Sequence, residues 1–415
     1  MDPLTPSRLR ATLLLLAAVQ FTHVMDFMIM MPLGPQLMEA FAIGPDRFAR
    51  LVASYGFSAG VCGLLATFVL DRFDRKRALL LLFGGFAVAT GACGLAANYP
   101  MLLGARVLAG AFGGVAGSVV TAMVGDVVPP SRRGAGMAFV MSAFSLAQII
   151  GVPAGLWLAA HADWHMPFLV LSGLAVVVNL AGMRVLPRVD AHLVHRGAQS
   201  DWRRVREIAS NPNHLRAFTV VVMLTMSGMI MVPFLATAVV RNGGASDQAL
   251  VLVYVLGGVA TLGTNNLLGR LGDRFGHVRV FDAMAVYAIV PVILVTHLAH
   301  WPLPIVLVVT TAFIVSMGGR WTPAMALVTM SVEARLRGGF MSLNSASQAA
   351  FGAVASTLAG MIVVEGQGGR LERYDWAGWA SLAFLGVAAV LIRRVRVVDT
   401  GAVPRPPEPE SGGLD

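Results

Sequence analysis

One carboxylate, Asp26, lies in a stretch that is otherwise mostly apolar from residue 11 to residue 38. Burying an unpaired charge in apolar surroundings is costly, and ionisable residues inside membrane spans usually serve a function. A carboxylate balanced between desolvation and a nearby cation can load and release a proton. His23 is one helical turn away and could relay protons to Asp26. The alternative is a carboxylate locked in a permanent ion pair.

Arg320 is a second isolated charge, in the other half of the chain. It precedes Arg337 by 17 residues, which is about 25 Å of helix and places it near the middle of a membrane. Arg320 could bind an anionic group of a substrate, act as the counterion of Asp26, or belong to a structural pair.

Uncharged residues in the apolar runs are candidates for lining a substrate cavity. Soft methionine side chains suit varied apolar ligands, although ordinary core packing or lipid contact is the alternative for them. Amide side chains could bind polar groups of a ligand. The candidates are Met25, Met226, Gln148, Asn344 and Gln348.

The chain shows no pattern typical of an enzyme. Cys62 and Cys93 both lie in apolar runs and build neither a disulfide framework nor a metal motif. No nucleophile and base pair, metal-ligand spacing or phosphate-binding loop is present. We therefore predict a protein without catalytic activity, cofactor or metal.

The composition defines the class of protein. The 415 residues are 56% hydrophobic and 13% charged, against about 25% charged in soluble domains. The net charge of +9 sits in short gaps between apolar runs, which is the pattern that sets membrane topology rather than nucleic-acid binding. The chain is therefore predicted to be an all-α polytopic membrane protein.

Twelve apolar stretches are long enough for transmembrane helices. The first follows Arg8 and Arg10 but is too long for a signal peptide, so we expect it to be retained. The predicted spans are 11–38, 49–70, 78–97, 100–125, 136–160, 166–187, 216–240, 248–270, 279–299, 302–327, 339–364 and 375–393.

Most Lys and Arg residues fall in alternate gaps, and this bias predicts that both termini are cytoplasmic. The longest polar segment divides the spans into six and six. We predict an N-terminal bundle at 1–187, a cytoplasmic linker at 188–215, a C-terminal bundle at 216–396 and a disordered cytoplasmic tail at 397–415.

The two halves share short motifs. "LDRFDRKRALLL", from Leu70, resembles "LGDRFGHVRVF", from Leu271, so that Asp71-Arg72-Phe73 matches Asp273-Arg274-Phe275. Each motif follows the second span of its half. A repeat at half-chain spacing is typical of transporters built from two helical bundles.

These motifs resemble those of the major facilitator superfamily, and more narrowly its twelve-span drug:proton antiporter and arabinose-efflux-like branch. The loop pattern Gly-x-x-x-Asp-Arg-x-Gly-Arg-Lys keeps its charges here, although Thr67 and Asp74 replace its glycines. "RVLAG" ends at Gly110 and fits Arg-x-x-x-Gly. "GVPAG", which contains Gly151, Pro153 and Gly155, matches a Gly/Pro-rich antiporter motif without its final doubled glycine.

The resemblance implies roles for several residues. Arg106 of "RVLAG" would approach the first span and control protonation of Asp26, or it would simply bond carbonyl groups of that span. The glycines and proline of the two motifs would pack helices. A cytoplasmic latch between the bundles would consist of Asp71, Arg72, Arg75 and Asp126, with Asp273, Arg274 and Glu333 as its counterpart and Asp273 facing the fifth span.

The implied function is proton-coupled efflux of small amphipathic or lipophilic compounds by alternating access, in a monomer of a bacterial inner membrane. The implied partners are the small-molecule substrate, protons and the lipid bilayer, with no nucleic acid. A sugar, metabolite or lysolipid transporter, working by export or symport, is the alternative within transport. A sensor or scaffold that has lost transport is the alternative outside it.

Overall fold

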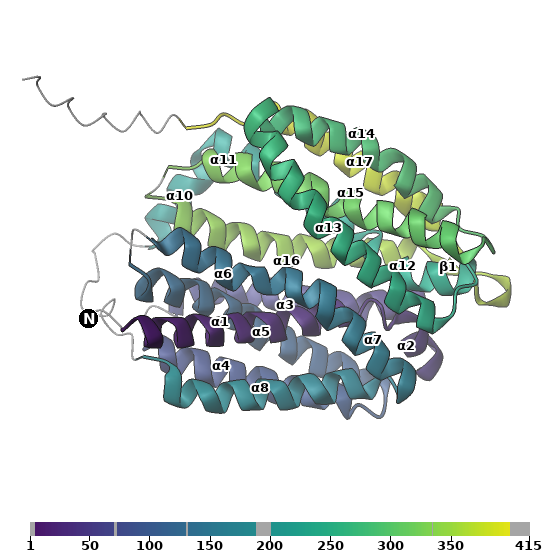
Figure 1. Ribbon diagram of the computed structural model, residues 1–415, viewed down its shortest axis with the longest axis horizontal. Helices are drawn as coiled ribbons and strands as arrows, with labels where there is room; N and C mark the ends of the chain where they lie inside the picture. The colour runs from purple at the N-terminus through teal and green to yellow at the C-terminus, as the bar shows by residue number, and fades with distance from the viewer. Residues whose placement is uncertain (1–4, 70–72, 130–131, 188–200, 334, 399–415) are drawn as a thin grey trace, which may run out of the picture.

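The chain folds almost entirely into helices in a computed structural model, which describes residues 5–69, 73–129, 132–187, 201–333 and 335–398. Ten long helices are continuous (Figure 1). They are α1 (Pro6–Ile29), α3 (Pro45–Val69), α4 (Arg75–Gly94), α5 (Tyr99–Val127), α8 (His165–Val185), α13 (Asp247–Phe275), α14 (His277–Thr296), α15 (Leu303–Met330), α16 (Arg337–Ile362) and α17 (Tyr374–Ile392).

Two further rods consist of consecutive pieces. One comprises α6 (Arg133–Leu146), the π-helix η3 (Ala147–Gly151) and α7 (Val152–His161), and the other comprises α11 (Pro212–Met229), α12 (Val232–Thr237) and the π-helix η4 (Ala238–Asn242). The remaining elements are short. They are α2 (Gly34–Ala40), α10 (Asp201–Ser210), the 3-10 turn η5 (Gln367–Gly369), and the paired strands β1 (Val364–Glu365) and β2 (Leu371–Glu372).

Eleven of the rods in the described part of the chain are long and apolar enough to cross a membrane. The twelfth, α16, has 26 residues but carries a polar run that includes Asn344 and Gln348. A helix of that length still spans the apolar thickness of a bilayer. The predicted all-α fold with twelve membrane-spanning rods is thus confirmed.

The predicted first span is wrong in its C-terminal part. Residues 11–38 do not form one helix, because α1 ends at Ile29 and α2 starts at Gly34. Pro32 lies within the break, and Pro35 lies in the first turn of α2. Proline lacks a donor N–H and disfavours helical geometry in the residue before it, so the helix cannot run through this segment.

Proline also shapes the fifth and seventh rods. Pro153 follows the π-helical turn at Ala147–Gly151, and Pro233 follows the break between α11 and α12. A proline ring clashes with the carbonyl four residues earlier, and a widened turn or a break relieves that clash. Each rod therefore bends in its middle, where the two halves of the molecule meet.

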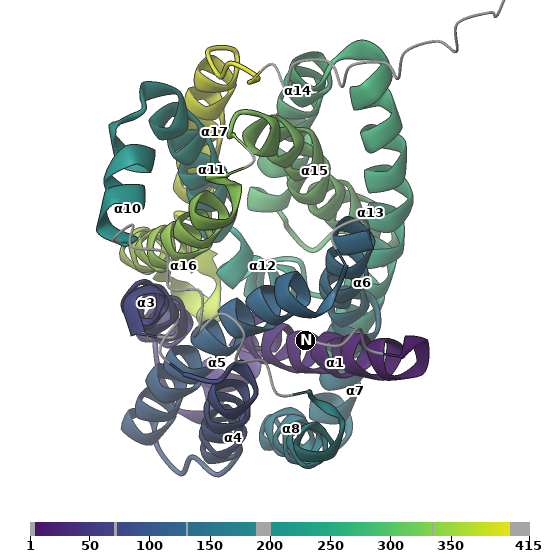
Figure 2. The same cartoon turned by 90° about the vertical axis from the view of Figure 1, so that its left-hand side faces the viewer.

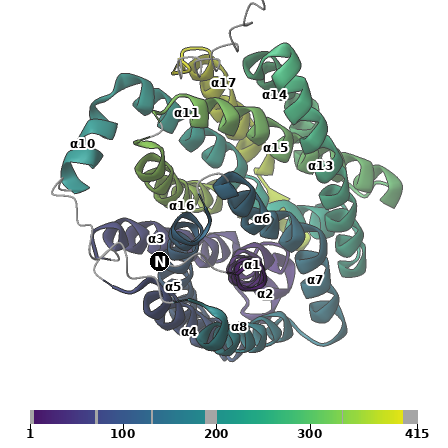
Figure 3. The same ribbon diagram turned by 60° about the vertical axis from the view of Figure 1, so that its left-hand side comes forward.

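The first six rods and the last six rods form two bundles, which occupy the lower and upper halves of Figure 1. Helices α3 and α16 lie side by side along the boundary, as do α7 and α13 (Figures 2 and 3). Small residues make the first contact close, because a Cβ added at Gly60 would lie 3.0 Å from the backbone nitrogen of Ala350. Such small-residue contacts are typical of helix packing in membranes.

The bundles also meet at the end of the molecule opposite the N-terminus, where α2 packs against α12. Phe48 and Phe234 make an edge-to-face contact there, with ring centroids 6.0 Å apart. The Gln36 amide donates to Asp247 across the boundary at 3.4 Å. One hydrophobic core continues through both bundles at this end, whereas each bundle has a separate core elsewhere.

The structure adds detail to the predicted linker and tail. Helix α10 lies within the predicted linker 188–215, whose residues 188–200 are outside the described part. Val398 donates its backbone N–H to the Met330 carbonyl at 3.0 Å, so the tail predicted from residue 397 starts with ordered chain. Residues 399–415 lie outside the described part.

Candidate functional site

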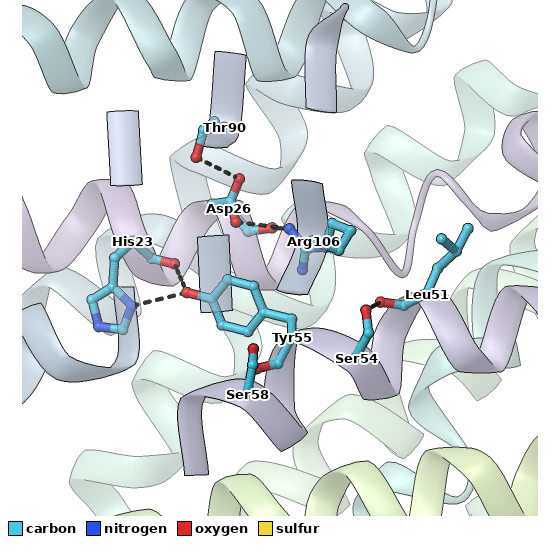
Figure 4. Close-up of polar contacts among 8 residues, drawn as sticks. All are labelled: His23, Asp26, Leu51, Ser54, Tyr55, Ser58, Thr90 and Arg106. Carbon is cyan, nitrogen blue, oxygen red and sulfur yellow. Dashed lines mark hydrogen bonds and ion pairs between the residues drawn. The ribbon is translucent and has the colours of Figure 1, made fainter. Parts of the chain in front are cut away.

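Asp26 and Arg106 form an ion pair in the interior of the N-terminal bundle (Figure 4). Both side chains are completely buried. Arg106 Nη1 donates to Asp26 Oδ2 at 2.7 Å and to the Asp26 backbone carbonyl at 3.3 Å. The hydroxyl of Thr90, on α4, donates to the other carboxylate oxygen at 3.2 Å. The carboxylate therefore has a partner on each oxygen, supplied by two different helices.

The Arg106 guanidinium is also placed over the ring of Tyr55, on α3, with 4.5 Å between its central carbon and the ring centroid. A cation over an aromatic face is stabilised by the ring quadrupole. Yet Arg106 Nε and Nη2 have no hydrogen-bond partner among the described residues. Arg106 is therefore held by one carboxylate, one carbonyl and one ring, with donor capacity left over.

Glycines in α5 bring α3 close enough for this arrangement. A Cβ added at Gly110 would collide with the Tyr55 carbonyl and the Ser58 hydroxyl, and one at Gly114 would lie 2.6 Å from the Ala59 Cβ. Gly110 follows Arg106 by one turn. The Arg-x-x-x-Gly spacing thus places the guanidinium next to Tyr55 at a close helix crossing.

The structure places His23 against Tyr55 rather than against Asp26. The Tyr55 hydroxyl lies 3.4 Å from His23 Nδ1 and 3.5 Å from the His23 carbonyl, to which it donates. Gly117 leaves room for the imidazole, because a Cβ there would lie 3.0 Å from Nε2. The predicted relay by His23 would therefore have to run through Tyr55.

Sequence reasoning missed Thr90 and Tyr55. Both are single polar residues in apolar spans, and this was the available signal. Because isolated hydroxyl groups are common in membrane helices and usually bond their own backbone, that signal is weak. Cys93, fully buried one turn beyond Thr90, lies on the same helix.

Side chains of α1 pack against two glycines of the Gly/Pro-rich motif, Gly151 and Gly155. A Cβ at Gly151 would lie 2.7 Å from Met25 Sδ, and one at Gly155 would lie 2.8 Å from Met25 Cε. Met25 is 4% exposed. Met25, expected to line a cavity, thus packs between α1 and the broken fifth rod, against these two glycines.

The other cavity candidates are scattered over both bundles. Met226 packs in a small cluster with Val222 and Ala355. Asn344 is buried, and its Oδ1 has no partner among the described residues. Gln148 and Gln348 are partly exposed.

Arg320 is not the counterion of Asp26 in this structure, since Arg106 occupies that place. It lies on α15 and is 2% exposed. Its Nη2 contacts the sulfur of Met317 at 2.7 Å, and its Nη1 has no partner among the described residues.

The structure describes one contact among the residues of the predicted latch, and the latch itself stays a prediction. Arg75, at the start of α4, lies 3.4 Å from Asp126 near the end of α5. Asp71 and Arg72 lie outside the described residues. The neighbouring Lys76 donates to the carbonyls of Met183 and Leu186 at the end of α8.

The C-terminal counterpart differs from the expectation. The Asp273 side chain is 80% exposed and lies 3.6 Å from His277, so it does not face the fifth rod. The cause is local: the chain turns at Gly276, whose φ of +92° brings His277 back toward the end of α13. Arg274 lies over the neighbouring Phe275 ring, and Glu333 pairs with Arg335 at 2.9 Å.

Twelve membrane-crossing rods in two bundles, with a buried ion pair inside one of them, define a polytopic membrane transporter. The model of the Major Facilitator Superfamily matches residues 16–318 and 217–413, and the chain belongs to this family. It is 25% identical over 353 residues to the uncharacterized MFS-type transporter YceJ of Bacillus subtilis (strain 168), covering 83% of this chain and 87% of YceJ.

Two further comparisons agree with this assignment. The inner membrane transport protein YdhP of Escherichia coli (strain K12) is 27% identical over 249 residues, covering 59% of this chain and 62% of YdhP. The partially occluded inward open xylose transporter XylE from E. coli superposes with a TM-score of 0.73 at 14% identity, covering 96% of this chain and 100% of XylE. The last likeness concerns the fold alone.

Proposed function

We propose that the protein is a proton-coupled exporter of small amphipathic or lipophilic compounds in a bacterial inner membrane. The observation that carries the proposal is the fully buried Asp26–Arg106 pair. Intramembrane ionisable residues are costly and commonly belong to proton or substrate pathways. A purely structural pair would gain little, because apolar residues of similar volume often stabilise a core equally well.

The pair offers a simple coupling step. When Asp26 takes up a proton, Arg106 loses its only described ionic partner and keeps the Asp26 carbonyl and the Tyr55 ring. The freed charge then favours a different packing of α1, α4 and α5, or a substrate group that replaces the carboxylate. One elementary charge crossing a potential of 100 mV supplies about 2.3 kcal/mol for this exchange.

The proposed orientation has both termini in the cytoplasm, as the distribution of Arg and Lys predicts. The closed end, where α2 meets α12, would then face outward, and export would require this contact to separate. The likeness to the partially occluded inward open state of XylE supports this assignment. The Arg75–Asp126 pair would lie at the cytoplasmic surface and bias the exchange between states.

Sugar, metabolite or lysolipid transport is the competing proposal. XylE, which has a similar fold, is a xylose transporter. A sugar site needs several converging polar groups. The buried amide oxygens without a partner among the described residues are divided between the bundles, with Gln20 and Asn179 in the first and Asn265 and Asn344 in the second. This distribution favours an amphipathic cargo.

The test is the accumulation of fluorescent cationic, neutral and anionic dyes in energised cells. Wild type should lower the accumulation of at least one dye, and an uncoupler or Asp26→Asn should each abolish that effect. Glu39→Gln, which alters an exposed carboxylate on α2, serves as the control and should export normally. Normal export by Asp26→Asn would refute the coupling role.

A further inference from the structure

Arg320 is a buried cation with few polar contacts among the described residues. It makes no ion pair with any Asp or Glu that the structure describes, and one of its terminal nitrogens has no partner there. Its other contact is the thioether of Met317, which is a weak acceptor. A guanidinium carries five N–H donors and stays charged at physiological pH. The charge of Arg320 is therefore not neutralised in this state.

The comparison with Arg106 shows what is missing. Arg106, also fully buried, has a carboxylate at 2.7 Å, a carbonyl and an aromatic face. Removing one partner of a buried ion pair is strongly destabilising, because the remaining charge is uncompensated. Arg320 is likewise a buried charge without a counterion among the described residues. An external anion that pairs with it for part of the transport cycle would offset this energetic cost.

The surroundings of Arg320 indicate what kind of anion fits. A Cβ at Gly319 would lie 2.9 Å from Leu268 and 3.5 Å from Met284 Sδ, so apolar side chains line one side of the helix. On another side, Gly318 lies near Asn265, whose Oδ1 is unpartnered among the described residues. Because residues two apart on a helix do not share a face, a ligand at Arg320 would meet the cation and mainly apolar groups rather than Asn265.

The Met317 side chain lies where it could move aside for such a ligand. Its side chain is partly exposed, and its sulfur faces Gly228 of α11, where an added Cβ would lie 3.9 Å away. Because glycine has no side chain, the flexible thioether has room to swing aside. Unbranched methionine side chains adapt to irregular and changing surroundings.

We propose that Arg320 binds the anionic group of an amphipathic cargo, a carboxylate, sulfonate or phosphate on an apolar body, after Met317 moves away. This inference rests on the proposed transport function and narrows its substrate class. Bidentate contact with an oxyanion suits the planar guanidinium. The apolar body of the cargo would lie against the methionine and leucine side chains.

The experiment is thermal unfolding of the purified full chain in dodecyl maltoside with matched probes. 4-Phenylbutyrate is compared with 4-phenylbutanamide, and naphthalene-2-sulfonate with naphthalene-2-sulfonamide. The anions should raise the Tm of wild type with Kd values about tenfold or more below those of their amides, the effect of a hydrogen bond to a charged group. Arg320→Gln should remove this preference, whereas Arg394→Gln, which alters an exposed arginine, should keep it.

Three results would overturn the inference. They are equal stabilisation by anion and amide, an anion preference that survives in Arg320→Gln, and Arg320-dependent stabilisation by dihexanoyl phosphatidylglycerol but by neither free anion. The third would identify a lipid site instead of a cargo site. Binding in detergent needs no proton gradient, so a failure of proton coupling leaves this result untouched, and the two proposals fail separately.

Discussion

At the scale of single residues, the Asp26–Arg106 pair is fully buried, yet some of its hydrogen-bond donors have no partner among the described residues. Asp26 has a partner on each carboxylate oxygen, while two nitrogens of Arg106 have none among the described residues. The pair is thus stable in this state but can still exchange partners. Asp26 can take up a proton, and Arg106 can bind a ligand instead. An ion pair of purely structural purpose would be expected to satisfy more of its donors.

Removing one charge of the pair should lower the free energy of unfolding more than removing both charges. Arg106→Gln leaves a buried carboxylate without its cation, so we expect a loss of about 3–5 kcal/mol in the free energy of unfolding. Asp26→Asn combined with Arg106→Gln should recover most of that loss. Denaturant unfolding of the purified variants measures both values.

The control for this cycle is Arg50→Gln. Arg50 pairs with Asp46 at 3.5 Å, but both side chains are more than half exposed, so the change should stay within about 1 kcal/mol. Equal losses for Arg106→Gln and for the double variant would contradict the account of a coupled buried pair.

The sequence was sufficient to single out Asp26 and Arg106, because a charge inside an apolar run is conspicuous. It could not decide the counterion of Asp26, since Arg106 and Arg320 both lie within membrane spans. Geometry decided it, because α5 crosses α1 next to Asp26. Tyr55 and Thr90 stayed unnoticed because a lone hydroxyl in a membrane helix carries little information.

At the scale of elements, glycines decide how closely helices approach and therefore where the charges sit. Gly110 on α5 lets the backbone of α3 come into direct contact at Tyr55 and Ser58. That crossing places the aromatic ring beneath Arg106. The same helix contains Gly104, which is exposed and has nothing within 4 Å of an added Cβ.

These two glycines form a matched pair of substitutions. Gly110→Ala should destabilise the protein by about 1–3 kcal/mol through overpacking and should impair transport by displacing Tyr55. Gly104→Ala should be neutral or stabilising by about 0.5–1 kcal/mol, because alanine is the better helix former. Thermal unfolding and dye export provide the two readouts. Equal behaviour of both variants would contradict the close crossing.

Helix α10 is held to the C-terminal bundle by polar contacts at its end. Arg335 hydrogen-bonds both carboxylate oxygens of Glu207, and Ile208 is buried near Gly339. The hydrogen bond from Arg335 lowers the pKa of Glu207 below its ordinary value of 4.5. The contact should therefore be complete near neutral pH and be lost as the pH falls below 4.5, when Glu207 becomes protonated.

Hydrogen exchange of residues 201–210 tests this attachment. Arg335→Ala should accelerate exchange there at neutral pH, and high salt should have a similar, weaker effect because exposed pairs are screened. Arg394→Ala is the control. Unchanged exchange in Arg335→Ala would show that the Arg335–Glu207 contact does not hold the helix in place.

Hydropathy predicted the number of rods but not their breaks. A run such as 11–38 is mostly apolar, and an apolar pattern alone does not reveal that α1 ends at Ile29, before Pro32. The prolines were visible in the sequence. Their effect depends on whether neighbouring helices satisfy the freed backbone groups, which is a property of the assembled bundle.

At the scale of the whole molecule, the two bundles touch along α3–α16 and α7–α13 and are closed at the end opposite the N-terminus. A pocket of about 490 Å³ lies at that end, beside the Gln36–Asp247 hydrogen bond. The half-chain repeat predicted two bundles. It could not predict which end is closed, because alternating states of one sequence differ by only a few kcal/mol.

Joining the bundles at the closed end should stop transport. Gln36→Cys with Asp247→Cys, in a Cys62→Ser and Cys93→Ser background, places one thiol on each bundle. A short bis-methanethiosulfonate bridge should abolish dye export, and a reductant should restore it. Either single-cysteine variant treated in the same way is the control. Unimpaired export by the bridged protein would mean that this contact does not separate during the cycle.

The central claim is that Asp26 carries the proton whose movement drives export of the cargo. A measurement of proton movement tests this claim most directly. Everted membrane vesicles with an acidified interior are loaded with a fluorescent pH probe, and dyes exported by cells are added outside. Wild type and Glu39→Gln should release protons from the vesicles on dye addition, and Asp26→Asn should release none. Dye-dependent proton release of normal size from Asp26→Asn would contradict the account.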